Sequence, residues 1–334
     1  MIAERPPSPI TAAARDFVAA HLDQAAALGL ALGELIDDPE SFARTLREGY
    51  QALADPAYQK GQEFIAPGLT DGIGVRIPLL AAVRRGITRR SRGANSASLL
   101  WLAERLLRGN PMLEERLLAF ELLERTIAKD PERTWQILRV AASRAGEWIT
   151  VDALAQPYAK GILAEPVRWA EIEQLAYATS RWERRLAGST IATMPFANRS
   201  AGRDPSVAAH ALPIIANLIG DSEPDVQKAL SWALRSIAVV DREAVAAFLE
   251  RETATASETN DGFRAWVIRD ALQAIPAAAA EPIRTRLAGI RRQVGGRSTS
   301  TAAAAAEAFY GGNPGMRDHG YVEQGARQAM RGPR

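Results

Sequence analysis

Apolar residues recur every three to four positions along most of this chain, which is the spacing of one face of an α-helix. Alanine, leucine, glutamate and arginine dominate these stretches, and the alternating β-branched runs that form strands are absent. Proline, glycine and aspartate interrupt the pattern at residues 129–134, 164–169, 220–226 and 257–263. In several breaks an aspartate or serine precedes a proline or glutamate, as an N-cap precedes the first turn of a helix. The pattern predicts an all-α protein.

A weak internal repeat runs through the helical region. Similar apolar stretches open with a basic residue at Arg116, Arg185, Lys228 and Arg264, at separations of 69, 43 and 36 residues. Since the first separation is about twice 35, the spacing is typical of HEAT-like or armadillo-type helical hairpins, which stack into an α-α superhelix, or solenoid. Stacking would place the bases in a row along a concave basic face. Amphipathic helices of similar composition can also resemble one another without any repeat.

The two ends of the chain differ from this middle region. Residues 1–50 are predicted to be a partly helical extension that begins with a proline-rich segment. Residues 51–290 would form the HEAT-like domain. Residues 291–334 are rich in arginine, glycine and alanine, which predicts a disordered tail with one short alanine-rich helix. A tail that touches DNA without regard to sequence is the alternative.

Composition excludes several kinds of chemistry. The chain has no cysteine, so disulfides, thiolate metal sites and cysteine nucleophiles are excluded. Its three histidines lie far apart without carboxylates at ligand spacing, and no glycine-rich phosphate loop occurs, so we expect no metal and no cofactor. No stretch has the length and hydropathy of a membrane span or a signal peptide. We therefore expect a cytoplasmic monomer with no membrane partner.

Arginine is concentrated in one segment of the chain. Eight arginines lie between Arg76 and Arg108 against a single acid, Glu104, although the net charge of the whole chain is only +2. Guanidinium groups suit phosphate better than ammonium groups do, so the segment indicates nucleic acid. A GC-rich genome would produce the same bias toward arginine.

Tryptophan recurs beside charged residues at helical spacing. Residues three or four apart share one face of a helix, and any one such pair is explained by an ordinary amphipathic helix. The pairs are Trp148 with Asp152 in "EWITVDALAQPY", Trp182 with Arg185 in "SRWERRLAG", and Lys228 with Trp232 in "VQKALSWALR".

Five sequence blocks follow one another in the region from Tyr58 to Leu249: "YQKGQEF…GVRIP" (58–78), "EERLLAFELLE" (114–124), "WITVD" (148–152), "WERR" (182–185) and "QKALSWALR" (227–235). In these blocks and their order the chain resembles the AlkD-type DNA alkylation repair enzymes, which are HEAT-like DNA glycosylases. One departure is Ile149, which stands where many relatives carry an aspartate.

The resemblance implies roles for individual residues. Asp152 would be the catalytic carboxylate that faces the sugar of a damaged nucleotide, with Trp148 and Trp232 on either side of it. Arg185 would grip the DNA backbone. Further DNA contacts are expected from two basic residues of the repeat, Lys228 and Arg116. Tyr58 and Lys60, which match a family segment near the DNA, are expected to contact it as well.

The resemblance also implies an activity. Family members remove cationic N3- or N7-alkylated purines and leave the base stacked, whereas other glycosylases flip it out of the duplex. We therefore expect a monofunctional alkylpurine DNA glycosylase whose partner is double-stranded DNA containing alkylated bases. No lysine lies near Asp152 in its motif, so hydrolysis without Schiff-base chemistry is expected. The alternatives are a non-catalytic HEAT-like module for branched or distorted DNA and a protein-binding scaffold.

Overall fold

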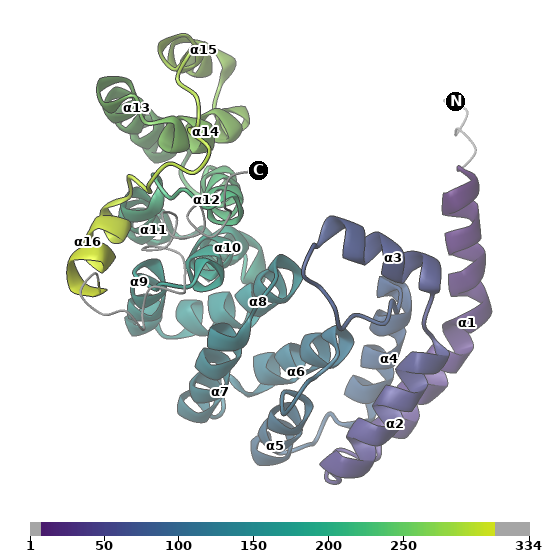
Figure 1. The fold of residues 1–334 in the computed structure, drawn as a ribbon. Helices are drawn as coiled ribbons and strands as arrows, with labels where there is room; N and C mark the ends of the chain where they lie inside the picture. The colour runs from purple at the N-terminus through teal and green to yellow at the C-terminus, as the bar shows by residue number, and fades with distance from the viewer. Residues whose placement is uncertain (1–7, 311–334) are drawn as a thin grey trace. The chain divides into compact units, whose positions relative to one another are not determined.

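The fold is built from helices alone. The computed structural model describes residues 8–310, in which sixteen α-helices follow one another and no strand occurs (Figure 1). The prediction of an all-α protein is confirmed. The chain divides into two compact units between Ile137 and Leu138. Among the described helices, none combines the length and the hydropathy needed to cross a bilayer.

The first unit holds six complete helices in its described part: α1 (Pro9–Gly33), α2 (Pro39–Ala52), α3 (Pro56–Ile65), α4 (Ile77–Arg90), α5 (Ser96–Leu106) and α6 (Leu113–Thr126). The division between the units falls within α7 (Pro131–Arg144). The helices of the second unit are α8 (Trp148–Ala164), α9 (Trp169–Ala176), α10 (Arg181–Ala197), α11 (Pro205–Leu218), α12 (Pro224–Ile237), α13 (Arg242–Thr259), α14 (Gly262–Ala271), α15 (Ala277–Arg286) and α16 (Thr301–Tyr310).

Helix starts follow the capping chemistry of the sequence. The carboxylates of Asp38, Asp55 and Asp204 accept backbone N–H groups at the starts of α2, α3 and α11. A proline follows each of these caps, where its missing N–H costs no helical hydrogen bond. In each Asp–Pro pair the aspartate therefore caps the helix and the proline is its first residue.

Helices of the second unit pack as expected for a HEAT-like array. Consecutive helices pack in pairs, α9 with α10, α11 with α12 and α13 with α14. The second members of these pairs also lie side by side, so that α10 contacts α12 and α12 contacts α14 (Figure 1). Helix α8 contacts α10 as well. Arg185, Lys228 and Arg264 lie on α10, α12 and α14. The weak sequence repeat therefore corresponds to equivalent helices of successive pairs.

The N-terminal extension joins the packing of the first unit. Helix α1 packs along α4, and Gly29 and Gly86 lie where their backbones meet. A Cβ atom on Gly29 would lie 2.2 Å from the carbonyl oxygen of Val83, and one on Gly86 would lie 2.5 Å from the carbonyl carbon of Gly29. Only glycine allows so close an approach of two helix backbones. Residues 9–33 are therefore an integral helix of this unit.

Two of the motif blocks meet at the start of α6. The buried carboxylate of Glu114 accepts the backbone N–H groups of Ile73, Gly74 and Val75, at 3.2, 3.0 and 3.2 Å. Gly74 has a φ of +84°, a conformation that favours glycine. Glu114 thus fixes the shape of the "GVRIP" segment.

The two residues after Glu114 make further ties. Glu115 accepts the N–H of Met112 at 2.8 Å and forms two bonds with the guanidinium of Arg47. Arg116 binds both carboxylate oxygens of Asp71, at 2.6 and 2.8 Å. All three charged residues of the "EER" motif therefore hold the first unit together.

Part of the predicted disordered tail is ordered. The N–H of Thr299 donates to the carbonyl of Gly220 at 2.9 Å, and its hydroxyl donates to Asp261 at 2.5 Å. Ala302 and Ala303 of the short helix α16 are buried. The alanine-rich helix agrees with the prediction, but residues 291–303 dock on the second unit instead of being disordered. Residues 311–334 of the tail, like residues 1–7, lie outside the described part of the chain.

We expect Glu114→Ala to destabilise the protein by about 3 kcal/mol or more, because three backbone donors lose their acceptor and each such loss costs roughly 1–3 kcal/mol. Urea unfolding followed by circular dichroism measures the change. Glu121→Ala is the control on the same helix, since Glu121 pairs with Arg84 at the surface and such pairs contribute less than about 1 kcal/mol. Equal losses in the two variants would contradict the role of Glu114.

Candidate active site

The site begins at the first turn of α8. Trp148 is the first residue of this helix, and its N-cap is Glu147, whose carboxylate accepts the N–H groups of Ile149 and Thr150 at 2.5 and 2.8 Å. Asp152 follows Trp148 by one turn, so the two side chains share a face. Both are half-buried. The capping carboxylate is that of Glu147, which leaves Asp152 free of this task.

Two residues of α10 hold the carboxylate of Asp152. The Nε of Arg185 donates to Oδ1 at 3.1 Å and its Nη2 donates to Oδ2 at 2.7 Å. The hydroxyl of Ser189, one turn further along α10 and fully buried, lies 2.6 Å from Oδ1 and donates to it. Three hydrogen bonds therefore fix the orientation of the carboxylate, while 22% of the Asp152 side chain remains exposed. The group is both rigid and accessible.

The guanidinium of Arg185 connects three helices. Besides Asp152 on α8, it binds the carbonyl of Asp225 in the first turn of α12, where Nη1 donates at 2.8 Å. It also lies over the ring of Trp148, 5.9 Å from the ring centroid. The side chain is 7% exposed. In this structure Arg185 positions Asp152, and contact with a DNA phosphate would require some of these bonds to rearrange. Its grip on the backbone stays a prediction.

The neighbouring Arg184 has a different environment. Its guanidinium is buried and pairs with the buried carboxylate of Asp221, with Nε 2.7 Å from Oδ2. Its Nη1 also donates to the carbonyls of Ala178 and Thr179, at 3.2 and 2.7 Å. Arg184 therefore ties the start of α10 to the turn before α12 and does not reach the Asp152 carboxylate.

Helix α12 carries the remaining predicted residues of this unit. Lys228 is exposed and Trp232 is half-buried. Asp225, Lys228 and Trp232 follow one another at intervals of three and four residues, so they share one face of α12. The carbonyl of Asp225 accepts a hydrogen bond from Arg185, the residue that holds Asp152. Trp232 therefore lies on the same face of α12 as a residue that contacts Arg185.

Tyr58, Lys60 and Arg116 belong to the first unit. The ring of Tyr58 lies beneath the guanidinium of Arg76, 5.1 Å from its centroid, and burial raises the pKa of its hydroxyl. Lys60 is exposed. Arg116 is engaged with Asp71, as described above. Their contacts with DNA stay predictions.

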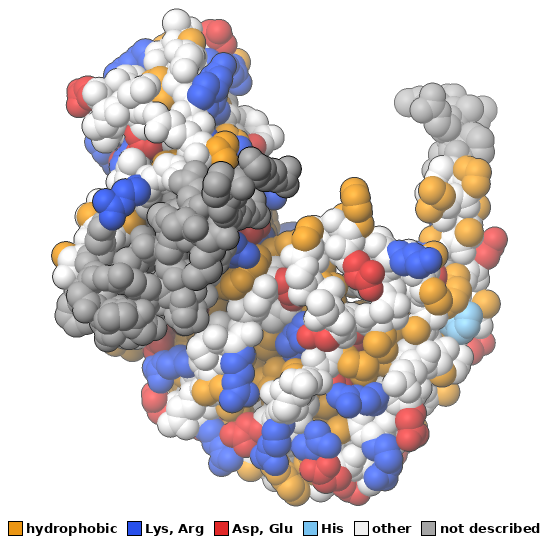
Figure 2. Space-filling model, viewed as in Figure 1, with side chains coloured by type: hydrophobic (Ala, Val, Ile, Leu, Met, Phe, Trp, Pro, Cys, Tyr) orange, Lys and Arg blue, Asp and Glu red, His pale blue; other side chains and the backbone are white. Residues whose placement is uncertain are grey.

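The basic residues expected to form a row along one face, Arg116, Arg185, Lys228 and Arg264, are mostly paired with acids. Arg264 is buried between Glu252 and Asp261, and Arg185 is buried beside Asp152. Arg116 is half-buried and pairs with Asp71. Lys228 alone of the four predicted bases is exposed. Figure 2 shows Lys and Arg side chains interspersed with Asp and Glu over the helices of the first unit. Ion pairing therefore reduces the positive charge that the sequence predicts for this row of basic residues.

The sequence interpretation did not include Ser189 among the site residues. Its position four residues after Arg185 places both on one face of α10, so helical spacing could have indicated it. A serine in an apolar stretch gives no further signal, because such a hydroxyl commonly bonds to its own helix. Within residues 8–310, no cluster of three or more His, Asp or Glu side chains could hold a metal ion.

Comparison with known proteins finds one family. The model of the family described as "DNA alkylation repair enzyme" matches residues 46–275. This range includes every residue named in this subsection. No curated protein and no solved structure gives a significant match.

We expect Arg184→Met to cost about 3–5 kcal/mol of stability, because it leaves the buried carboxylate of Asp221 without a positively charged partner. The double variant Arg184→Met/Asp221→Leu should recover most of this loss, since two apolar side chains can replace a buried ion pair at little cost. Chemical denaturation of the four proteins of this cycle measures the coupling. A double variant no more stable than Arg184→Met would contradict a purely structural pair.

Proposed function

Because the chain belongs to the family of DNA alkylation repair enzymes, we propose that it is a monofunctional DNA glycosylase that hydrolyses the N-glycosidic bond of cationic alkylated purines in duplex DNA. N3-methyladenine and N7-methylguanine represent this class of lesion. One observation supports the proposal most: the carboxylate of Asp152 is held rigidly by Arg185 and Ser189, yet it remains partly exposed beside Trp148.

The lesion itself supplies part of the reactivity. Alkylation at N3 or N7 gives the purine a positive charge, so the base leaves with the electron pair of the broken bond to C1′. The sugar then carries oxocarbenium character, as in other glycosidic cleavages. At an effective dielectric constant of about 20 and a separation of about 4 Å, a carboxylate stabilises such a cation by roughly 4 kcal/mol. This corresponds to an acceleration on the order of a thousandfold.

The hydrogen bonds of Asp152 leave room for this chemistry. A carboxylate has about four acceptor positions, and the contacts with Arg185 and Ser189 use three of them. The remaining position can orient the attacking water, whose oxygen adds to C1′ while its proton passes to the carboxylate. Asp152 thus serves first as an electrostatic stabiliser and then as a base.

The tryptophans and the exposed lysine have binding roles in this proposal. The faces of Trp148 and Trp232 attract cations, and each contributes about 0.5–2 kcal/mol in favour of the charged lesion over neutral DNA. Lys228 binds a backbone phosphate, and Arg116, Lys60 and Tyr58 of the first unit make further contacts with the DNA backbone. These contacts are independent of sequence and weaken as salt concentration rises. The damaged base stays stacked, so no deep base pocket is required.

A second candidate is a module that binds branched or distorted DNA without cleaving it. The pairing of both Asp152 oxygens with Arg185 is the observation that favours it, since such a pair can serve stability alone. This candidate predicts that wild-type protein releases no alkylated base.

We expect Asp152→Asn to lower the single-turnover rate of N7-methylguanine release from alkylated duplex DNA by a hundredfold or more. The reason is that the substitution removes the negative charge that stabilises the sugar cation. DNA affinity should be retained. Asp270→Asn is the control, because it neutralises another carboxylate of the second unit that pairs with an arginine, Arg235, away from the site. Equal release by Asp152→Asn and wild type, or none by wild type, would overturn the proposed role.

We expect Ser189→Ala to lower the same rate by about tenfold or more without weakening DNA binding, because a hydrogen bond to a charged group contributes roughly 1.5–3 kcal/mol. The matched control is Thr190→Val, which removes an adjacent buried hydroxyl that has no hydrogen-bond partner among the described residues. Similar rates for the two variants would show that Ser189 does not position Asp152.

A further inference from the structure

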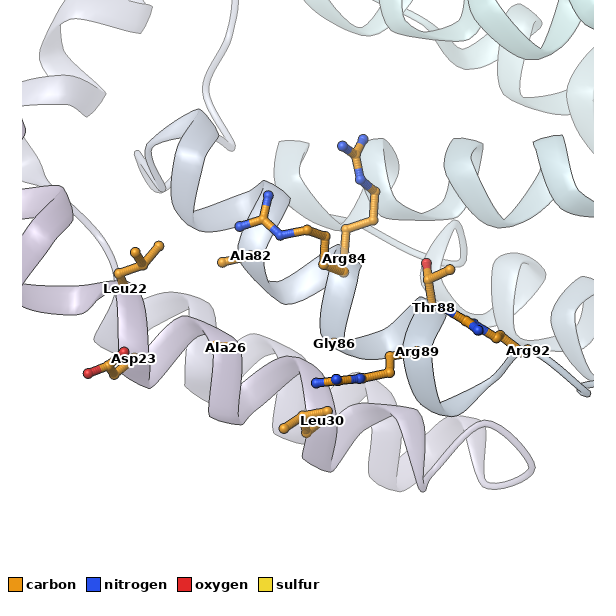
Figure 3. Close-up of a pocket in the computed structure, with 11 residues that line it drawn as sticks. Leu22, Asp23, Ala26, Leu30, Ala82, Arg84, Gly86, Thr88, Arg89 and Arg92 are labelled. Atoms are coloured by element: carbon orange, nitrogen blue, oxygen red, sulfur yellow. The ribbon is translucent and has the colours of Figure 1, made fainter.

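A groove of about 730 Å³ lies between α1 and α4 in the first unit (Figure 3). Its floor is apolar and is formed in part by Leu22, Ala26 and Leu30 of α1. Arginines line the α4 side, and Asp23 is the single acid in the lining. The groove therefore combines a narrow apolar floor with a strongly basic wall.

Three of the arginines in this wall are not neutralised. Arg85, Arg89 and Arg92 are exposed, and within residues 8–310 they form no ion pair or hydrogen bond. Three other arginines of this region are paired with acids: Arg84, which also lines the groove, with Glu121, Arg90 with Glu34 and Arg105 with Glu40. The groove therefore presents three exposed guanidinium groups that no acid of the described residues neutralises.

The spacing of these arginines suits a row of phosphates. Arg85 and Arg89 lie one turn apart on α4, and Arg92 follows just beyond its end. At about 1.5 Å per residue their span is roughly 10 Å, while a DNA strand carries one phosphate per 3.4 Å or so of axis. Arg89 extends from α4 over Leu30 of α1 (Figure 3). The row of three side chains therefore extends over about three phosphate steps of one strand.

We propose that the groove between α1 and α4 binds the backbone phosphates of duplex DNA through Arg85, Arg89 and Arg92. A guanidinium group can bind two oxygens of one phosphate at the same time. It also stays positively charged over the whole pH range in which proteins are studied. Such contacts position the protein without reading sequence. Helix α1 lies outside residues 46–275, so this chain completes the site with a helix beyond its family match. The inference rests on the proposed function only in taking DNA as the partner.

The test compares two triple variants that change the net charge equally. The groove variant is Arg85→Gln/Arg89→Gln/Arg92→Gln. The control variant is Arg90→Gln/Arg105→Gln/Arg133→Gln, whose arginines lie in the same unit but outside the groove lining and are paired with Glu34, Glu40 and Glu104. The affinity of the full-length protein for a short undamaged duplex is measured by fluorescence anisotropy between about 50 and 200 mM salt, the range in which phosphate contacts dominate. Thermal unfolding verifies that both variants are folded.

The slope of log affinity against log salt concentration should fall in magnitude by about 2 to 3 in the groove variant, since each lost phosphate contact contributes roughly 0.9. The control should change the slope by less than about 1. Asp23→Asn should strengthen binding, because it removes the acid from the groove. Equal slopes for the two triple variants would overturn the proposal, and a groove built for an acidic protein would give that result. Base release from alkylated DNA is a separate readout, so the glycosylase and the groove can fail independently.

Discussion

The buried guanidinium of Arg185 is the interaction on which the candidate site depends. A charge removed from water is costly unless it is paired and fully hydrogen-bonded. Here the partners come from two other helices, Asp152 on α8 and the carbonyl of Asp225 on α12. The contact that packs three helices together is thus the contact that orients the carboxylate. Local packing and the chemistry proposed for Asp152 are therefore coupled through one side chain.

Similar arginine–carboxylate pairs recur at nearly the same sequence separation. The two residues are 33 apart in Asp152–Arg185, 37 in Arg184–Asp221 and 35 in Arg235–Asp270. These separations match the period near 35 that the helical repeat shows. An arginine on one helix therefore reaches an acid on a neighbouring helix of the stack or, for Asp221, in the turn that precedes it. These three arginines join neighbouring repeats, whether or not DNA is bound.

The sequence predicted the features that depend on local spacing. Helix content follows from periodicity and capping, and the spacing of Trp148 and Asp152 places them on one helix face. The partners of the arginines could not be predicted, since they are set by packing between helices some 35 residues apart. The order of residues 291–303 could not be predicted for a related reason. Their small polar composition favours disorder locally, but contacts with Gly220 and Asp261 order them.

Ile149 stands where the family resemblance leads us to expect an acid, and this raises the question of which carboxylate caps the helix that carries Asp152. The first turn of a helix leaves several N–H groups unpaired, and a nearby carboxylate tends to bind them. At the start of α8 this demand is met by Glu147, which lies before Trp148 and binds the N–H groups of Ile149 and Thr150. An acid at position 149 is thus not needed to cap this helix. Asp152 can direct its oxygens toward Arg185, Ser189 and the solvent, which is the arrangement that a carboxylate facing a sugar cation requires.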